Sequence, residues 1–184
     1  MSDEVLTAAR SLVQRNGLTA LNLTAVAREA GISRATVYRR FSSKEQLVDA
    51  LVHAELRDLE TLVRSRVKFA DEPRETTRML VRAVLDHLTD NAPLQAALRI
   101  DGSTLTPWLV RGGDQPTLVD VVTERTLVFV KESPLAPHLS PDPASAVEFL
   151  VSVVFAELLS PARYVSHAQV ASYVAEALHP RATA

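Results

Sequence analysis

The 184-residue sequence predicts an all-α protein, and three observations support this fold class. Apolar residues recur at helical spacing along most of the chain. β-Branched residues such as Val121, Val122 and Val153 lie inside these helical patterns rather than in alternating ones. Residues that favour helix starts, and glycines and prolines that end helices, stand between the apolar runs. No segment therefore reads convincingly as a strand.

About nine helices are expected. They cover approximately residues 3–16, 24–30, 33–40, 42–68, 71–91, 93–101, 116–133, 143–159 and 166–178. Asn16 and Gly17 end the first helix, since these residues commonly close helices. Thr24 is predicted to cap the second helix, which ends at Gly31, and Ser33 is predicted to cap the third.

The boundaries of the later helices are predicted from capping residues and from prolines and glycines that interrupt helices. Residues 42–46 offer a capping box that opens the long fourth helix. Pro73 is tolerated in the first turn of the fifth helix. Pro107 and two following glycines predict that residues 103–115 form a loop. The prolines at 134, 137, 141 and 143 separate the seventh helix from the eighth.

Charge is distributed unevenly along the chain, whose formal net charge is -2. Residues 1–45 carry seven basic and four acidic side chains, whereas residues 46–184 carry thirteen basic and eighteen acidic ones. This asymmetry suggests a DNA-facing domain at 1–45 and a separate helical domain at 46–184. Chance clustering of charge on a solvated surface is the alternative interpretation.

The segment 24–44 has the pattern of a helix-turn-helix. Ala27 is small enough for two short helices to approach each other, and Gly31 supplies the turn between them. Ile32 and Val37 anchor the second of these helices, so that its opposite face is free to enter a major groove. The pattern therefore predicts a DNA-binding module.

At this point the sequence resembles the TetR family of bacterial transcriptional regulators. The matching residues are Gly17, Leu23, Thr24, Val26, Ala27, Ala30, Gly31, Ile32, Ser33, Thr36, Val37, Tyr38, Phe41, Lys44, Glu45 and Leu47. They cover about the first 50 residues. The resemblance implies an N-terminal three-helix domain that binds DNA, joined by a long helix to a helical-bundle domain for ligand binding and dimerisation.

The resemblance and the side-chain chemistry together give a set of expected DNA contacts. The set is Thr24, Arg34, Ala35, Thr36, Tyr38, Arg39, Arg40 and Lys44. Thr24, Tyr38 and Lys44 match family positions that grip phosphates, whereas Arg34 and Thr36 are suited to base edges. Arginine at both 39 and 40 departs from the family pattern, so Arg39 is assigned to either a base or a phosphate. Core packing is the alternative role for Tyr38.

A homodimer is expected, because one recognition helix reads only a few base pairs. The helix at 143–159 is apolar on almost every side, which indicates burial both in its own bundle and against a partner. A central helix in a monomeric bundle is the alternative. The expected interface residues are Val147, Leu150, Val151, Val154, Leu158, Val170, Tyr173 and Val174.

The larger domain is expected to bind a small apolar or amphipathic effector. The candidate ligand-binding residues are Met79, His87, Trp108, Phe129, Phe149 and Tyr164, for which core packing is the alternative role. No metal site or cofactor is predicted. The sequence lacks cysteine, and His138 and His167 have no acidic partner at ligand spacing.

The expected function is a cytoplasmic, DNA-binding repressor that binds a palindromic operator as a homodimer and leaves it when a small molecule binds. An enzyme is not expected, because the sequence has no glycine-rich phosphate loop, nucleophile elbow or zinc-protease motif. No secretory signal or membrane-spanning segment is evident. The alternative is a helix-turn-helix regulator that is controlled by a protein partner, or that acts without a ligand.

Overall fold

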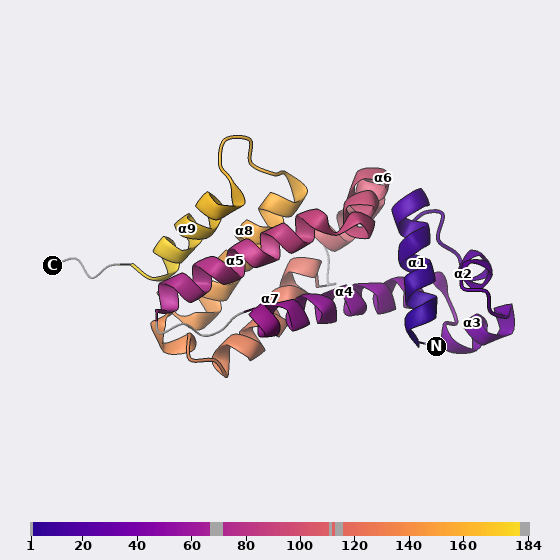
Figure 1. The fold of residues 1–184 in the computed structure, drawn as a ribbon, viewed down its shortest axis with the longest axis horizontal. Coiled ribbons are helices and arrows are strands. Elements are labelled where there is room, and N and C mark those ends of the chain that lie inside the picture. The colour runs from indigo at the N-terminus through magenta and orange to yellow at the C-terminus, as the bar shows by residue number, and fades with distance from the viewer. Residues whose placement is uncertain (1, 67–71, 111, 113–115, 181–184) are drawn as a thin grey trace. The chain divides into compact units, whose positions relative to one another are not determined.

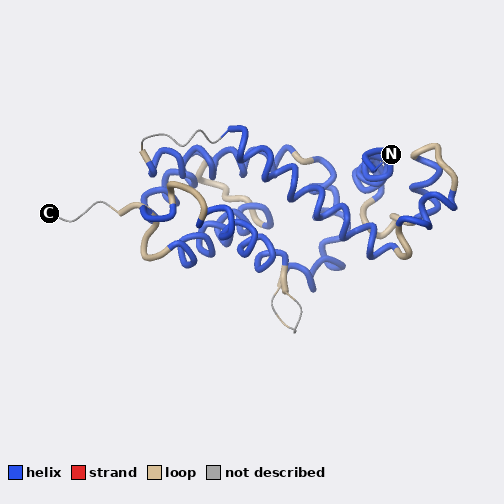
Figure 2. Tube along the Cα trace, turned by 90° about the horizontal axis from the view of Figure 1, so that it is seen from below, coloured by secondary structure: helices blue, strands red, loops and turns tan. Residues whose placement is uncertain are grey.

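A computed structural model describes residues 2–66, 72–110, 112 and 116–180. Over these residues the chain forms α-helices and one short 3-10 helix, with no strand (Figures 1 and 2). The elements are α1 (Ser2–Asn16), α2 (Leu23–Glu29), α3 (Arg34–Arg40), α4 (Lys44–Arg66), α5 (Pro73–Asp90), α6 (Ala92–Leu109), α7 (Leu118–Lys131), η1 (Ala136–His138), α8 (Pro143–Leu159) and α9 (His167–Leu178). The all-α prediction is confirmed.

The chain divides into two compact units. The first comprises Met1–Leu59 and Asp90–Leu105, and the second comprises Glu60–Thr89 and Thr106–Ala184. The first unit has a continuous apolar core to which α1, α2, α3, the first half of α4 and α6 contribute. Its least exposed large side chains are Leu21, Val26, Val37 and Leu47.

Local capping explains the short helices of the first unit. The Asn22 side chain caps α2 by accepting a hydrogen bond of 2.8 Å from the Ala25 amide. The prediction that Thr24 is the cap is wrong, because the acceptor two residues earlier takes that role. Ser33 caps α3 as predicted, accepting from the Thr36 amide at 3.1 Å. Gly31 has a φ of 66°, as the predicted turn requires.

Helix α6 is longer than the sequence predicts. It continues to Leu109, so the loop prediction is wrong for residues 103–109. The chain departs from helical geometry at Asp101, where φ is -113° and ψ is 17°, and then resumes a helix. The break is thus confined to one residue, and the remainder of the predicted loop falls partly outside the described residues.

The second unit is assembled around two pairs of helices. Helix α7 packs along α8 through a core that includes Val130, Val147 and Val151. Helices α5 and α9 are connected at both ends: the Thr77 hydroxyl lies 2.8 Å from His179 Nε2, and His167 Nδ1 lies 2.8 Å from an Asp86 oxygen. Because Thr77 lies in the first half of α5 while His179 follows α9, the two helices run antiparallel (Figure 1).

Candidate nucleic-acid interface

Helix α3 is fixed to the first unit by one side only. Val37 is fully buried, and Phe41, the residue after the helix, is also part of the core. The Ser33 cap fixes the first turn, and the hydroxyls of Ser33 and Thr36 lie 2.8 Å apart. Since no other residue of α3 is buried, the rest of the helix surface is available to a partner.

The available surface of α3 is basic. Arg34, Ala35, Tyr38, Arg39 and Arg40 are exposed and Thr36 is half-buried; their contacts with DNA stay a prediction. Within the part of the chain that the structure describes, Arg34 and Arg39 have no side-chain partner. No acidic side chain among the described residues therefore neutralises their charge.

Arg40 differs from the other two arginines of α3. Its guanidinium lies over the Phe41 ring, 5.1 Å from the ring centroid. Such a cation–π contact restrains the side chain. The two arginines without a partner, Arg34 and Arg39, are consequently the better candidates for reading base edges.

Two arginines of α1 are paired with acids. Arg10 contacts Glu55 and Asp58, each at 2.6 Å, and Arg15 lies 2.8 Å from Glu29. The hydrogen bond from Arg15 lowers the pKa of Glu29. The basic residues of α1 therefore carry acidic neighbours, whereas α3 contains no acidic residue. Three of the seven residues of α3 are arginines, so this helix is the strongly basic one beside the paired cations of α1.

The two remaining phosphate candidates lie at or near helix starts. Thr24 is half-buried and is the second residue of α2, and Lys44 is the first residue of α4. The Lys44 ammonium donates a hydrogen bond of 3.1 Å to the Thr19 carbonyl. An ammonium has three N–H donors, so this bond leaves two for phosphate oxygens.

A buried carboxylate lies beside this lysine contact. Asp101 of α6 is only 2% exposed. It accepts hydrogen bonds from the Leu18 amide at 2.5 Å, from the Thr19 amide at 3.0 Å and from the Thr19 hydroxyl. Burial raises the pKa of Asp101, but these hydrogen bonds and the charge of Lys44 outweigh burial, so the pKa lies below its ordinary value. Sequence analysis missed this residue.

The lowered pKa of Asp101 predicts an acid-sensitive contribution to stability. A carboxylate with a depressed folded-state pKa stabilises the protein above its unfolded pKa, and this stabilisation is lost as the pH falls through the folded pKa. We expect the difference in unfolding free energy between the wild type and Asp101→Asn to be constant from about pH 7 to about pH 4 and to shrink below that. Urea unfolding at several pH values measures it. A difference that grows on acidification would contradict the assignment.

A short capped helix that presents arginines beyond a glycine turn defines a helix-turn-helix DNA-binding protein. Residues 5–51 match the family model of bacterial regulatory proteins of the tetR family. The chain is 28% identical over 189 aligned residues to the uncharacterized HTH-type transcriptional regulator Rv1255c of Mycobacterium tuberculosis, with 100% of this chain and 88% of that protein covered. The chain is thus similar to TetR-family regulators over residues 5–51 and, at 28% identity, to an HTH-type transcriptional regulator over its whole length.

Solved structures share the fold. The TetR family repressor AlkX from Dietzia sp. superposes with a TM-score of 0.70 at 20% identity, over 94% of this chain and 92% of AlkX. AibR in complex with isovaleryl coenzyme A and operator DNA has a TM-score of 0.59 at 19% identity, over 97% of this chain and 98% of AibR. At such identities the likeness concerns the fold alone.

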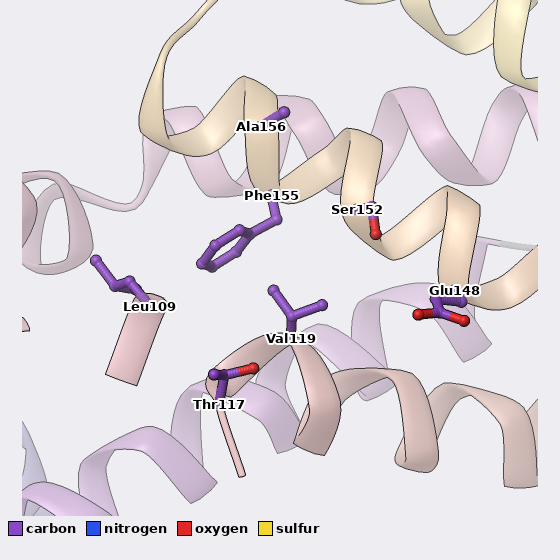
Figure 3. Close-up of a pocket in the computed structure, with 7 residues that line it drawn as sticks. All are labelled: Leu109, Thr117, Val119, Glu148, Ser152, Phe155 and Ala156. Atoms are coloured by element: carbon purple, nitrogen blue, oxygen red, sulfur yellow. The ribbon is translucent and has the colours of Figure 1, made fainter. Parts of the chain in front are cut away.

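The second unit contains a cavity of about 260 Å³ (Figure 3). Its lining residues come from the end of α6, the start of α7 and α8: Leu109, Thr117, Val119, Glu148, Ser152, Phe155 and Ala156. The Phe155 ring extends from α8 toward Leu109 and Val119 (Figure 3). The Thr117 hydroxyl is already used, since it donates to Asp120 at 2.7 Å. The cavity is mainly apolar, with Ser152 and Glu148 as its other polar side chains.

None of the six ligand candidates from the sequence lines this cavity, and the structure does not bring them together. Met79, Trp108 and Phe149 are exposed on three different helices, and Tyr164 is 94% exposed in the segment after α8. His87 is half-buried on α5. Phe129 packs against the α7–α8 core and is covered by the Arg64 guanidinium, 5.3 Å from its centroid. Their roles as ligand contacts stay a prediction.

Most of the predicted dimer contacts already pack inside the second unit. The buried ones are Val147, Val151, Val154, Val170 and Val174. Leu150 and Leu158 are half-buried, and Tyr173 is 57% exposed. The side of α8 that is free of such packing instead carries Phe149, Ser152, Ala156 and Leu159, and two of these, Ser152 and Ala156, also line the cavity. Helical periodicity did not distinguish these two sides, because both are largely apolar.

The described ranges contain neither a metal-binding cluster nor a membrane-spanning helix. Within residues 2–66, 72–110, 112 and 116–180, no cluster of three or more histidine, aspartate or glutamate side chains is arranged to hold a metal ion. Over the same residues, no helix has the length and apolar character needed to cross a membrane.

Proposed function

We propose that this chain is a TetR-family regulator: a homodimeric repressor that binds a palindromic operator and releases it when a small molecule occupies the second unit. The observation that carries the proposal is the pair of exposed arginines without a partner, Arg34 and Arg39, on a helix that is buried on one side only. A bidentate arginine contact to guanine is the commonest specific contact in a major groove. Because operators lie on the bacterial chromosome, the proposal also puts the protein in the cytoplasm.

A dimer is supported by the requirements of recognition and by the surface of α8. Helix-turn-helix dimers read two half-sites about 34 to 36 Å apart, which multiplies the specificity of a single helix. The uncovered side of α8 carries Phe149 and Leu159, at 45% and 44% exposure, with the small residues Ser152 and Ala156 between them. Tyr173 is exposed on α9, which packs against α8. Large apolar side chains in this arrangement favour a partner helix.

A small-molecule effector is supported by the cavity and by the relatives. The cavity is lined by Leu109, Val119, Phe155 and Ala156, with a few polar groups, which is the usual composition of a ligand site. AibR, which has the same fold, binds both isovaleryl coenzyme A and operator DNA. A coupling of about 1 to 3 kcal/mol between such sites lowers operator affinity by about 5- to 150-fold.

Substitution of the arginines of α3 tests the DNA half of the proposal. We expect Arg39→Ala and Arg34→Ala each to lower affinity by about 1 to 3 kcal/mol and to relax the preference at one position per half-site. Lys44→Ala should weaken binding to all sequences alike and reduce the salt dependence. Affinity is measured by fluorescence anisotropy on a duplex that the wild type has selected from a random library, and on mismatched variants of it.

Arg99→Ala provides the matched control. Arg99 is exposed on α6 in the same unit, so its substitution removes one positive charge without touching α3. It should leave sequence preference unchanged. If Arg99→Ala weakens binding as much as Arg39→Ala, net charge rather than base reading accounts for the affinity, and the proposed role of α3 is wrong.

The dimer and effector are tested with the same duplex. Gel filtration should give twice the mass of the chain, and the footprint should show two symmetric half-sites. A thermal-shift screen of small apolar and amphipathic molecules identifies ligands, since a ligand at 100 times its dissociation constant stabilises the protein by about 2.7 kcal/mol. Ligands that stabilise the protein without weakening its binding to the duplex would contradict release by ligand.

A further inference from the structure

The first unit contains a continuous line of polar contacts from α6 to the start of α4. At one end is the buried Asp101 carboxylate, located at the break in α6. It accepts hydrogen bonds from the Leu18 amide, the Thr19 amide and the Thr19 hydroxyl. At the other end, the Lys44 ammonium donates to the Thr19 carbonyl at 3.1 Å. Residue Thr19 thus has its amide, hydroxyl and carbonyl engaged by two helices.

Gly17 shows that this turn is packed directly against α6. Its φ is 77°, a conformation that side-chain-bearing residues rarely adopt. A Cβ atom at this position would lie 2.7 Å from Ile100 Cγ2 and would also meet the Asp101 carboxylate. The turn between α1 and α2 is therefore located by steric contact as well as by hydrogen bonds. It has little freedom to shift independently of α6.

The negative charge of Asp101 and the positive charge of Lys44 stabilise this line of contacts. Asp101 is ionised, and burial makes an ionised carboxylate costly unless its oxygens accept hydrogen bonds. The three donors at Leu18 and Thr19 meet that requirement. Lys44 is half-buried and its charge is attracted to this carboxylate, which favours keeping the ammonium on the Thr19 carbonyl. A lysine side chain that is not restrained in this way samples many rotamers.

We propose that Asp101 is a positioning residue for DNA binding: through Thr19 it holds the Lys44 ammonium in the orientation that grips a phosphate. Asp101 itself does not touch DNA. The inference rests on the proposed role of Lys44 as a phosphate contact. By this proposal α6, which lies outside the helix-turn-helix motif, contributes to the DNA affinity of the first unit.

A double-mutant cycle tests this proposal on the full-length protein. The variants are Asp101→Asn, Lys44→Ala and the double substitution, measured on the duplex selected by the wild type. We expect Asp101→Asn to weaken binding about tenfold in the wild-type background and less than about twofold in the Lys44→Ala background. The slope of log affinity against log salt should also fall for Asp101→Asn, toward the value of Lys44→Ala. A purely structural role for Asp101 would move neither the non-additivity nor the slope.

Amide hydrogen exchange and a control substitution complete the test. Exchange at Leu18 and Thr19 should accelerate in Asp101→Asn, since their acceptor has lost its charge. Asp90→Asn, the same chemical change at an exposed residue of the unit, should leave affinity and exchange unaltered. Should Asp101→Asn fail to fold, Thr19→Val removes only the hydroxyl donor at an exposed position and is used in the same cycle, with a smaller expected effect of the same sign.

The outcomes distinguish the phosphate contact of Lys44 from the positioning role of Asp101. If Lys44→Ala binds as tightly as the wild type, the proposed phosphate contact is wrong. If Lys44→Ala weakens binding but Asp101→Asn costs the same factor in both backgrounds, the phosphate contact stands and the positioning role of Asp101 is overturned.

Discussion

Replacing Gly17 with alanine is expected to lower the free energy of unfolding of the first unit by about 2 to 5 kcal/mol. Two costs add. A left-handed backbone with φ of 77° disfavours any residue with a Cβ by about 1 to 2 kcal/mol. The new methyl group would also lie within 2.7 Å of Ile100, which is closer than packed atoms tolerate, so α6 must shift at a further cost of about 1 to 3 kcal/mol. Equilibrium urea unfolding of the variant measures the loss.

Gly31→Ala is the matched control for this prediction. Gly31 has nearly the same backbone conformation, with φ of 66°, but a Cβ there would meet no atom within 4 Å. Only the conformational cost of about 1 to 2 kcal/mol therefore remains. Equal losses for the two variants would show that α6 yields freely at Gly17, and would weaken the case that this turn is fixed against it.

Leu47→Ala is expected to cost about 2 to 5 kcal/mol, the range for truncating a fully buried leucine. Leu47 is 0% exposed and belongs to the core that also contains Val37, the buried residue of α3. The cavity left by the substitution weakens the core that holds α3. DNA affinity should therefore fall together with stability, as measured by urea unfolding and by anisotropy at increasing protein concentration.

Leu56→Ala provides the comparison on the same helix. Leu56 is half-buried, so truncation should cost about 1 kcal/mol and leave DNA affinity near that of the wild type. A loss at Leu56 equal to that at Leu47 would contradict the burial on which the first prediction depends.

The helix-turn-helix was predictable because its determinants are local. Ser33 caps α3 with a hydrogen bond to a residue three positions later, and the turn glycine needs only its own backbone freedom. The cap of α2 was misassigned because Asn22 and Thr24 are both acceptable cap residues two positions apart. Local chemistry alone does not rank them decisively.

Helix α6 shows where local reasoning fails. Gly102 and Pro107 have the composition of a loop, yet the chain resumes a helix after a single non-helical residue. The conformation of Asp101 is coupled to hydrogen bonds with Leu18 and Thr19, more than 80 positions earlier in the sequence. No pattern within α6 contains that information. Because residues 103–115 were predicted to form a loop, Leu109 was not recognised as a residue that lines the cavity.

The cavity and the dimer surface were harder to predict for a related reason. Helix α8 is apolar on most of its circumference, so periodicity gives no orientation. Packing against α7 turns Val147 and Val151 inward and leaves Phe149 exposed. Which of the apolar residues are free for a ligand or a partner is decided by tertiary packing, and aromatic residues chosen for their type alone were dispersed over the unit.

The size of the cavity limits which ligands it can enclose. At about 260 Å³ it is below the range of about 300 to 1,000 Å³ that drug-sized molecules occupy. Its walls are α7 and α8, which are packed on each other through valine side chains, and the last turn of α6. Ser152 and Ala156, which also line it, are exposed, so the cavity opens to solvent along α8. A larger molecule bound there would therefore extend over the uncovered side of α8, where a partner helix is proposed to pack.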